Sequence, residues 1–397
     1  MHSTFWISIG LLFYTYVAYP LALLVVGSVG QLLSDARFGL ARRTRRAGRG
    51  DVRPRVSIVF AAHDEAAVIA QKMANCARLD YPADRIDILV GCDGCSDGTA
   101  ALARAAAPDN ATVYEFMERS GKPAVLNRLV PLATGEIVVF CDANTDLEAD
   151  AIHALVRHFA QPGVGCVCGE LRLRASGGRA DGERLYWRFE TMLKFFESRL
   201  NMLVGANGAL FAIRRSLFRP LPQDGIVDDF LIALNVRAAG SRVVYDPEAV
   251  AREDVAPDAR QEFRRRVRIG AGNFHALRHT WRLLSPTAGS VALALWSHKI
   301  CRWIAPLALA AAELSAACLS RDPMYGAAAA TGGAVVLLAA AGCRLERRAR
   351  YWAPASVPYH FLSMNLALVL GLVAFARGSQ SIIWTPTTRT ARAAETP

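Results

Sequence analysis

The chain has 397 residues, of which 53% are hydrophobic, with a mean hydropathy of +0.21 and a formal net charge of +11. This hydropathy is too high for an ordinary soluble domain, and the excess lies towards the two ends of the chain. Arginine clusters flank the apolar stretches, so the positive charge fits membrane topology better than nucleic-acid binding. We therefore expect contact with membrane lipids and no nucleic-acid partner.

The first 34 residues contain no Asp, Glu, Lys or Arg and are long enough to span a tilted path through a bilayer. They lack a basic start and an A-x-A cleavage site, which argues against a removed signal peptide. The next stretch is rich in arginine, and by the positive-inside rule it is cytoplasmic. We predict a transmembrane helix at 1–34 and a basic cytoplasmic linker at 35–53, in an inner-membrane protein whose Met1 lies outside.

The segment 54–290 is predicted to be a cytosolic domain in which short apolar runs alternate with helical segments. Its first strands are expected at 55–60, 86–90, 112–116 and 137–141, with helices between them. This alternation predicts βαβ units and an α/β fold with a mostly parallel sheet and helices on both faces.

Polar residues follow these strands at the edge of the sheet where ligands usually collect. The central strand, 137–141, leads into Asp142 and Asn144, which suit a hard divalent cation or, alternatively, cap a following helix. Asp93 can accept hydrogen bonds from a ribose or base, or serve only as a turn residue. Lys122 precedes a helix and either meets phosphate or lies solvated on the surface.

Nine cysteines are scattered over the chain, including a C-x-x-C pair, Cys92 and Cys95, and a C-x-C pair, Cys166 and Cys168. A zinc site made from these four residues would have an unusual second pair. Small buried thiols in a reducing cytosol are the simpler interpretation.

Four motifs in chain order, V-S-I-V-F-A-A-H-D-E, C-D-G-C-S-D-G-T, G-K-P-A-V-L-N and C-D-A-N, resemble the nucleotide-binding half of family 2 glycosyltransferases. These are inverting enzymes with the GT-A fold, and the resemblance covers about 54–300. The apolar flanks are similar to those of membrane-embedded polysaccharide synthases of the cellulose, hyaluronan and poly-N-acetylglucosamine type. The resemblance implies a nucleotide-sugar donor, UDP-linked, a Mg²⁺ or Mn²⁺ cofactor, and a glycan or lipid-linked acceptor.

The resemblance also assigns residues to the donor side. Ala62, Glu65 and Asp93 would line the nucleoside pocket, and Lys122 would lie near the nucleotide. The next two residues after Ala62, a histidine and an aspartate, replace the family's aromatic residue and Asn, so no role is carried onto them.

The metal motif departs from the family pattern at its second acid. Asp142 would bind the metal on the donor diphosphate, and Asn144 stands where the family has the second Asp of D-x-D. An amide oxygen can ligate a metal, but the site carries one negative charge less.

On the acceptor side, Gly205, Asn207 and Gly208 lie in a segment that resembles the family's acceptor floor. Asp228 and Asp229 resemble its Glu-Asp motif, with Asp228 in the Glu place. Asp229 would be the general base, ionised at neutral pH by the start of a helix at 230–239. Alternatively, the two acids only start that helix.

Processive family members have Gln-x-x-Arg-Trp where this chain has an arginine-rich segment, 261–269. Only Arg268 matches, and it is expected to hold the diphosphate, although lipid contact is also compatible with so basic a segment. Ile269 replaces the Trp, which leaves processivity open.

After Ser290 we predict an interfacial helix at 291–303, about three transmembrane helices within 304–376, and a polar tail at 377–397, with the orientation of the last span open. Glu313 inside a span is a functional candidate or a partner in a helix–helix hydrogen bond.

Three functions are compatible with this sequence: a hexosyltransferase that extends a polysaccharide, a single-sugar transferase acting on a lipid-linked acceptor, and a non-catalytic membrane scaffold with a glycosyltransferase-like domain.

Overall fold

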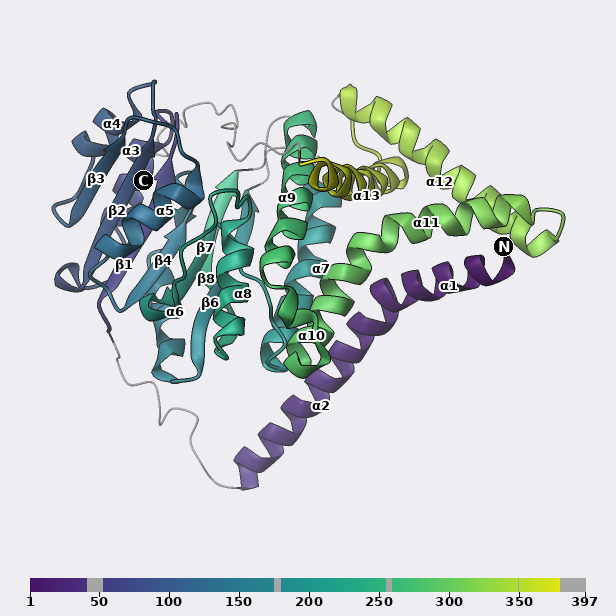
Figure 1. Ribbon diagram of the computed structural model, residues 1–397, viewed down its shortest axis with the longest axis horizontal. Coiled ribbons are helices and arrows are strands. Elements are labelled where there is room, and N and C mark those ends of the chain that lie inside the picture. Colours follow the sequence, from purple (N-terminus) through teal and green to yellow (C-terminus); the bar gives the residue numbers. More distant parts are fainter. Residues whose placement is uncertain (41–52, 175–179, 255–258, 349, 379–397) are drawn as a thin grey trace.

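The architecture is that of a computed structural model, which describes residues 1–40, 53–174, 180–254, 259–348 and 350–378 (Figure 1). A sheet domain occupies one side of the molecule. Long apolar helices occupy the other side, and α7 (Ala180–Arg199) and α9 (Ala259–His279) stand between the two. Most of the arginine-rich linker and of the C-terminal tail predicted from the sequence lies outside the described residues.

The sheet has eight strands in the order β3-β2-β1-β4-β7-β6-β8-β5. Their bounds are β1 Val56–Ala62, β2 Ile86–Asp93, β3 Ala111–Phe116, β4 Ile137–Cys141, β5 Asp146–Leu147, β6 Val164–Arg174, β7 Leu210–Arg214 and β8 Arg242–Asp254. The first four in this order are parallel, β7 is antiparallel to both of its neighbours, and β6 and β8 are parallel again. This confirms the predicted mostly parallel α/β sheet.

Helices cover both faces of the sheet because alternate residues of each buried strand point to opposite sides. In β4, Val138 and Phe140 belong to one core cluster, whereas Ile137 and Val139 belong to another. The first cluster also contains side chains of α5 (Lys122–Leu129) and α8 (Asp228–Ala238). The second is covered by α3 (Ile69–Ala77), α4 (Thr99–Ala105) and α6 (Ala151–Val156). All of β4 is buried, as expected for a central strand.

Four helical stretches in the described part of the chain are long and apolar enough to cross a membrane: His2–Leu33, Ser290–Cys318, Pro323–Arg347 and Ala353–Arg377. The first comprises α1 (His2–Phe13), a π-helical turn and the start of α2 (Tyr19–Leu40). The second joins α10 (Ser290–Ala294), another π-helical turn and α11 (Cys301–Cys318), so the residues predicted as an interfacial helix continue unbroken into the next span. The last two are α12 (Pro323–Arg347) and α13 (Ala353–Arg377).

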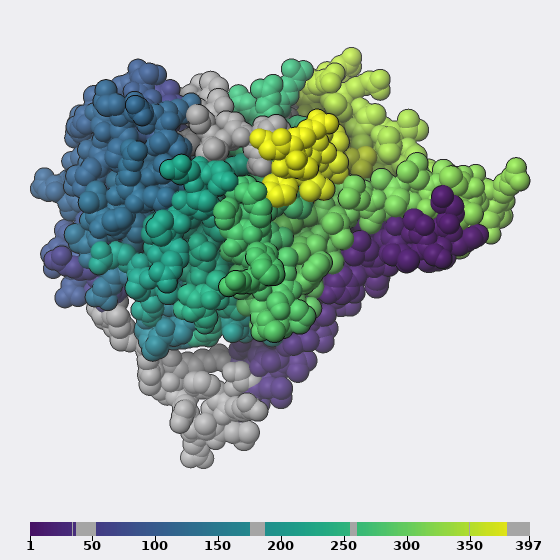
Figure 2. Space-filling view, in the orientation of Figure 1, coloured from purple at the N-terminus to yellow at the C-terminus, as the bar shows by residue number. Residues whose placement is uncertain are grey.

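The N-terminal helix lies along α11 and reaches the turn between α11 and α12 (Figure 2). There, Phe5 packs edge-on against Tyr325, and the Tyr325 hydroxyl lies 2.9 Å from Nδ1 of His2. Nearer the sheet domain, the Tyr19 hydroxyl donates a hydrogen bond to Glu197 of α7 (2.8 Å). The N-terminal helix therefore connects the sheet domain with the C-terminal apolar helices.

Candidate active site

A cavity of about 1210 Å³ lies where the carboxyl ends of the central strands meet α8, α9 and the apolar helices. Most residues predicted from the sequence line it: Glu65, Lys122, Asp142, Asn144, Gly205, Asn207, Gly208, Asp228, Asp229 and Arg268. Ala62 and Asp93 are buried beside it and do not line it. The fold thus brings the predicted donor and acceptor residues into one space, although they are far apart in the sequence.

Lys122 joins the two acidic motifs of the cavity. Its Nζ lies 2.8 Å from Oδ1 of Asp142 and 3.2 Å from Oδ2 of Asp228. Burial alone would lower the pKa of Lys122, but the two neighbouring carboxylates outweigh it, so the net shift is upward and the amine stays charged. An amine held between two acids can move its hydrogen bonds to a phosphate oxygen, and the carboxylates that it leaves can then bind a metal.

Asp229 is the second residue of α8 and faces the predicted acceptor floor. Its Oδ2 accepts a hydrogen bond from the Gly208 backbone N–H (2.7 Å), and its Oδ1 accepts one from the N–H of Phe230 (2.7 Å). A methyl group on Gly208 would lie 3.3 Å from Asp229 Oδ2 and 3.7 Å from Asp142 Oδ2. Glycine at this position therefore lets the backbone approach both carboxylates closely.

Burial and the adjacent Asp228 raise the pKa of Asp229 to about 6. The helix start was expected to favour the charged form, but here desolvation is the larger effect. Because pH 7 lies about one unit above this pKa, the carboxylate is mainly ionised at neutral pH, as a general base must be.

Asn144 is paired with an acid that the sequence did not identify. Its Nδ2 donates a hydrogen bond of 2.7 Å to Oε1 of Glu253, near the end of β8. Glu253 is buried and also lines the cavity. The carboxylate that the D-x-N motif lacks is thus provided beside it by a strand more than 100 residues further along the chain.

Lys72 of α3 is a second residue that the sequence did not single out. It is almost completely buried, and its Nζ donates to the Thr145 carbonyl oxygen (2.7 Å). The Thr145 hydroxyl in turn donates to the carbonyl oxygen of Asp142 (2.9 Å). Lys72 therefore holds the turn that carries Asp142 and Asn144. Lys72 lies on a helix face that mixes polar and apolar residues, so the sequence pattern did not mark it as a buried residue.

Asp93 is buried and fixes the loop before Lys122. Its two carboxylate oxygens accept hydrogen bonds from the backbone N–H groups of Ser120 (2.7 Å) and Gly121 (2.8 Å). Gly121 has φ +89°, a conformation that favours glycine. In this arrangement Asp93 positions the start of α5, and with it Lys122.

Arginines of α9 line another part of the cavity: Arg264, Arg265, Arg266 and Arg268. Glu262 forms an ion pair with Arg266 (2.8 Å). Burial, followed by repulsion from Arg265, lowers the pKa of Arg268, and the carboxylates of Asp228 and Asp142 oppose this shift. The cavity therefore has an acidic side at the sheet and a basic side at α9.

A buried charge network closes the cavity next to the apolar helices. Glu190 of α7 pairs with Arg302 (2.7 Å) and Lys299 (3.3 Å). His298 lies 2.8 Å from Glu197 through Nδ1. These charges led us to place an interfacial helix at 291–303, but the acids of α7 face them, so the helix can continue.

Comparisons with known proteins agree with this geometry. A family model described as "Glycosyltransferase like family 2" matches residues 54–272. Among curated proteins, the probable glycosyltransferase YdaM of Bacillus subtilis is 26% identical over 246 residues, covering 55% of each chain. A poly-beta-1,6-N-acetyl-D-glucosamine synthase of Staphylococcus aureus is 24% identical over 231 residues, covering 56% of this chain and 55% of its own. The chain thus spans about half the length of these curated relatives.

A solved structure resembles the chain over nearly all of its length. It is the mannosyltransferase PcManGT from Pyrobaculum calidifontis in complex with GDP-Man and Mn²⁺, with 25% identity and a TM-score of 0.68. The match covers 91% of this chain and 99% of that one, which identifies the sheet domain as a GT-A fold. Since the family model also covers more than half of the sequence, the chain belongs to glycosyltransferase family 2.

Proposed function

We propose that this protein is a membrane-bound inverting glycosyltransferase, which moves a sugar from a nucleotide-sugar donor to an acceptor hydroxyl. One observation carries the proposal: Lys122, Asp142, Asp228 and Asp229 converge in one cavity, with Gly208 against two of them. A scaffold would not need this arrangement of buried charge, which is why we favour catalysis over a non-catalytic role.

The donor side would be built around a divalent cation, Mg²⁺ or Mn²⁺. Asp142 and Asn144 are its proposed ligands, and Glu253 adds negative charge next to Asn144. All three offer oxygen atoms, which suit a hard cation. The cation would neutralise the donor diphosphate, while Lys122 and Arg268 would bind phosphate oxygens. Glu65 lines the cavity and would contact the nucleoside, whereas buried Ala62 and Asp93 would shape that pocket from behind.

On the acceptor side, Asp229 would take the proton from the attacking hydroxyl as the sugar bond to the nucleoside diphosphate breaks on the opposite face. The backbone at Gly205 and Gly208, with Asn207 and Asp228, would form the floor on which the acceptor lies. The hydrogen bond from Gly208 N–H holds one oxygen of Asp229 in place, which favours a fixed direction of proton transfer.

The acceptor has two candidate forms. The Staphylococcus aureus relative named as a polysaccharide synthase supports a growing glycan. Single transfer to a lipid-linked acceptor is supported by the cavity itself, because its lining continues from Asp229 to Phe361 and Leu368 of the candidate membrane span α13. Ile269, which also lines the cavity, provides no aromatic ring for a sugar chain to stack on.

The domain organisation we propose has a catalytic domain at 54–290 on the cytoplasmic side, between an N-terminal span and about three C-terminal spans, the first of which includes the residues predicted as an interfacial helix. The contact between His2 and Tyr325 supports this, because it places the N-terminus and the α11–α12 turn at the same end of the helices.

The experiment that tests the function is nucleotide release by the full chain purified in detergent. UDP- and GDP-linked sugars are offered with Mn²⁺ or Mg²⁺, because the resemblance implied UDP whereas the solved neighbour holds GDP-mannose. We expect cation-dependent release from one donor, and its loss in Asp142→Asn. No release from any donor, with lipid-phosphate and glycan acceptors both supplied, would contradict the proposal. The length of the product then separates the two acceptors.

A further inference from the structure

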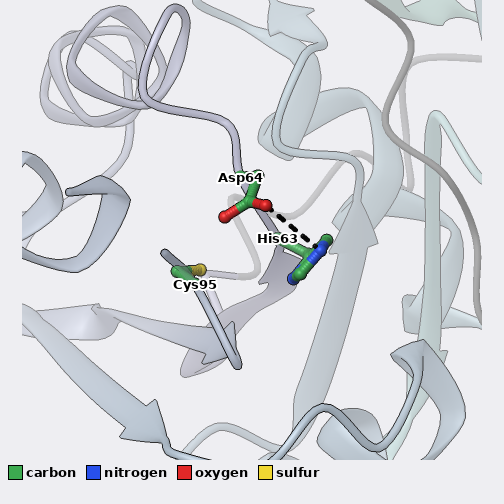
Figure 3. A group of neighbouring side chains, drawn as sticks. All are labelled: His63, Asp64 and Cys95. Atoms are coloured by element: carbon green, nitrogen blue, oxygen red, sulfur yellow. Dashed lines mark ion pairs between the residues drawn. The ribbon is translucent and has the colours of Figure 1, made fainter. Parts of the chain in front are cut away.

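A second group of metal-ligating side chains lies outside the cavity, on the loops that follow β1 and β2 (Figure 3). One ligand atom each of His63, Asp64 and Cys95 lies within 4.8 Å of the other two. In Figure 3 the three side chains converge from two separate loop segments. They therefore provide nitrogen, oxygen and sulfur at one point of the fold.

The orientation of His63 is fixed by the backbone. Its Nδ1 lies 2.6 Å from the carbonyl oxygen of Asp93, and since a carbonyl only accepts, Nδ1 must carry the proton. In the neutral ring, Nε2 then has the lone pair, and Nε2 faces Oδ2 of Asp64 at 3.4 Å. A ring held by a carbonyl through one nitrogen, with the other nitrogen directed at the ligand set, is the usual arrangement of a metal-binding histidine.

Asp64 is also held in a defined direction. Its Oδ1 accepts a hydrogen bond from the backbone N–H of Ser96 (2.8 Å), which leaves Oδ2 on the side of His63. Asp64 has φ +49°, a left-handed conformation that few residues other than glycine adopt, although Asp and Asn tolerate it. The loop thus adopts an uncommon backbone conformation at the residue that presents this carboxylate.

Cys95 presents its sulfur where the two loops meet. Its thiol donates a hydrogen bond of 3.5 Å to the carbonyl oxygen of Ala62, at the end of β1. The thiol would give up this proton on binding a metal, because the thiolate is the form that binds. Cys95 is partly exposed, whereas Cys166 and Cys168, the other pair noted in the sequence, are buried in β6.

We propose that His63, Asp64 and Cys95 bind a borderline-soft divalent cation such as Zn²⁺, with a fourth position open to water. The mixed nitrogen, oxygen and sulfur set suits Zn²⁺, whereas the oxygens around Asp142 suit Mg²⁺ or Mn²⁺. Metal binding would release the thiol proton of Cys95. Zinc–ligand bonds of about 2.0–2.3 Å require the three atoms to draw together by roughly 1 Å, which the half-exposed Asp64 side chain can accommodate.

Such a site would tie the loop after β1 to the loop after β2. These loops also carry Ala62, Glu65 and Asp93, which the proposed function assigns to the nucleoside pocket, but the three zinc ligands are different from those of the catalytic metal. The expected physical consequence is slower amide hydrogen exchange in residues 62–68 and 93–98 when Zn²⁺ is bound.

The test uses Co²⁺ as a spectroscopic probe on the full chain, purified in detergent and kept reduced. We expect one Co²⁺ with a thiolate-to-metal absorption band, displaced by Zn²⁺, in the parent and in the control variants Cys318→Ser and Asp142→Asn. Cys95→Ser should lose the band. Asp64→Asn, which tolerates the same backbone conformation, should weaken binding at least about tenfold.

Absence of the band in the parent, or its persistence in Cys95→Ser, would overturn the site. Parental Co²⁺ affinity in Asp64→Asn would overturn the ligand set. Unchanged exchange in both loops on Zn²⁺ addition would overturn the proposed tie between them.

Discussion

The side-chain amide of Asn144 donates a hydrogen bond of 2.7 Å to the carboxylate of Glu253. This pairing joins the turn after β4 to the far end of β8 and holds the amide nitrogen of Asn144 on Glu253, so the amide oxygen is the atom that Asn144 would offer to a metal. Glu253 also places a carboxylate beside the D-x-N motif. The D-x-N sequence is therefore compatible with a metal site of ordinary charge.

The pairing predicts the outcome of a charge exchange. Glu253→Gln should weaken Mn²⁺ binding about tenfold or more, because it removes a carboxylate that orients a metal ligand. The double variant Asn144→Asp/Glu253→Gln should recover affinity, since the carboxylate moves to the other residue of the pair. Titration of each purified variant with Mn²⁺ measures this. Parental affinity in Glu253→Gln would show that Glu253 does not belong to the site.

Lys72 is predicted to be a positioning residue for the same turn. Lys72→Met leaves the Thr145 carbonyl oxygen buried without its donor, which should cost about 1–3 kcal/mol of stability. It should also weaken Mn²⁺ binding, because the turn that carries Asp142 loses its support. Arg78→Met, at the exposed end of the same helix, is the matched control and should change neither property. Loss of stability with unchanged metal affinity would limit Lys72 to a structural role.

The contact between α9 and α13 requires glycine at Gly371. A methyl group there would lie 2.9 Å from both the backbone nitrogen of Ala271 and the carbonyl oxygen of Val267. We expect Gly371→Ala to lower stability in detergent by about 1–3 kcal/mol and to reduce transfer, because α9 carries the arginines of the cavity. Gly333→Ala, on α12 where no atom lies within 4 Å, should be neutral. Equal melting temperatures of the two variants would argue against the contact.

Topology can be tested with cysteine labelling in intact cells. Cys318 is exposed at the α11–α12 turn, at the same end as the N-terminus, so an impermeant thiol reagent should label it. A cysteine introduced at Met117, an exposed residue of the sheet domain, should be labelled only after lysis. Cys318→Ser provides the background. Labelling at position 117 in intact cells would place the sheet domain outside.

The sequence predicted the strands and the edge of the sheet at which the motifs gather, because apolar β-branched runs and the polar residues after them are local signals. It could not predict Glu253 or Lys72, since their roles depend on partners more than 70 residues away. It placed Asp93 in the nucleoside pocket, whereas the fold turns its carboxylate to the loop before Lys122.

The helix at 290–318 shows the same limit. His298, Lys299 and Arg302 indicated an interfacial position when only the sequence was considered. Their partners, Glu190 and Glu197, come from α7, which no local pattern connects with this segment.

Acid pH should slow sugar transfer because it protonates Asp229. A base works only when ionised, so with a pKa of about 6 the value of kcat/KM should fall as pH decreases through 6. Stability has the opposite dependence: because the folded pKa lies above the usual value, the charged form disfavours folding as pH rises from about 4 to 6. Asp229→Asn, which cannot titrate, should therefore lose this fall in stability between pH 4 and 6. A kcat/KM that stays constant from pH 7 to 5 would exclude Asp229 as the base.

The central claim is tested most directly by measuring donor affinity and transfer rate together on Asp229→Asn. This substitution keeps the shape of the side chain and removes its basicity, so nucleotide-sugar binding should remain near the parental value while transfer falls about 10²- to 10⁴-fold. Asp228→Asn is the matched neighbour and should lose less. Near-parental transfer by Asp229→Asn would contradict the mechanism, and loss of donor binding together with transfer would make Asp229 a structural residue.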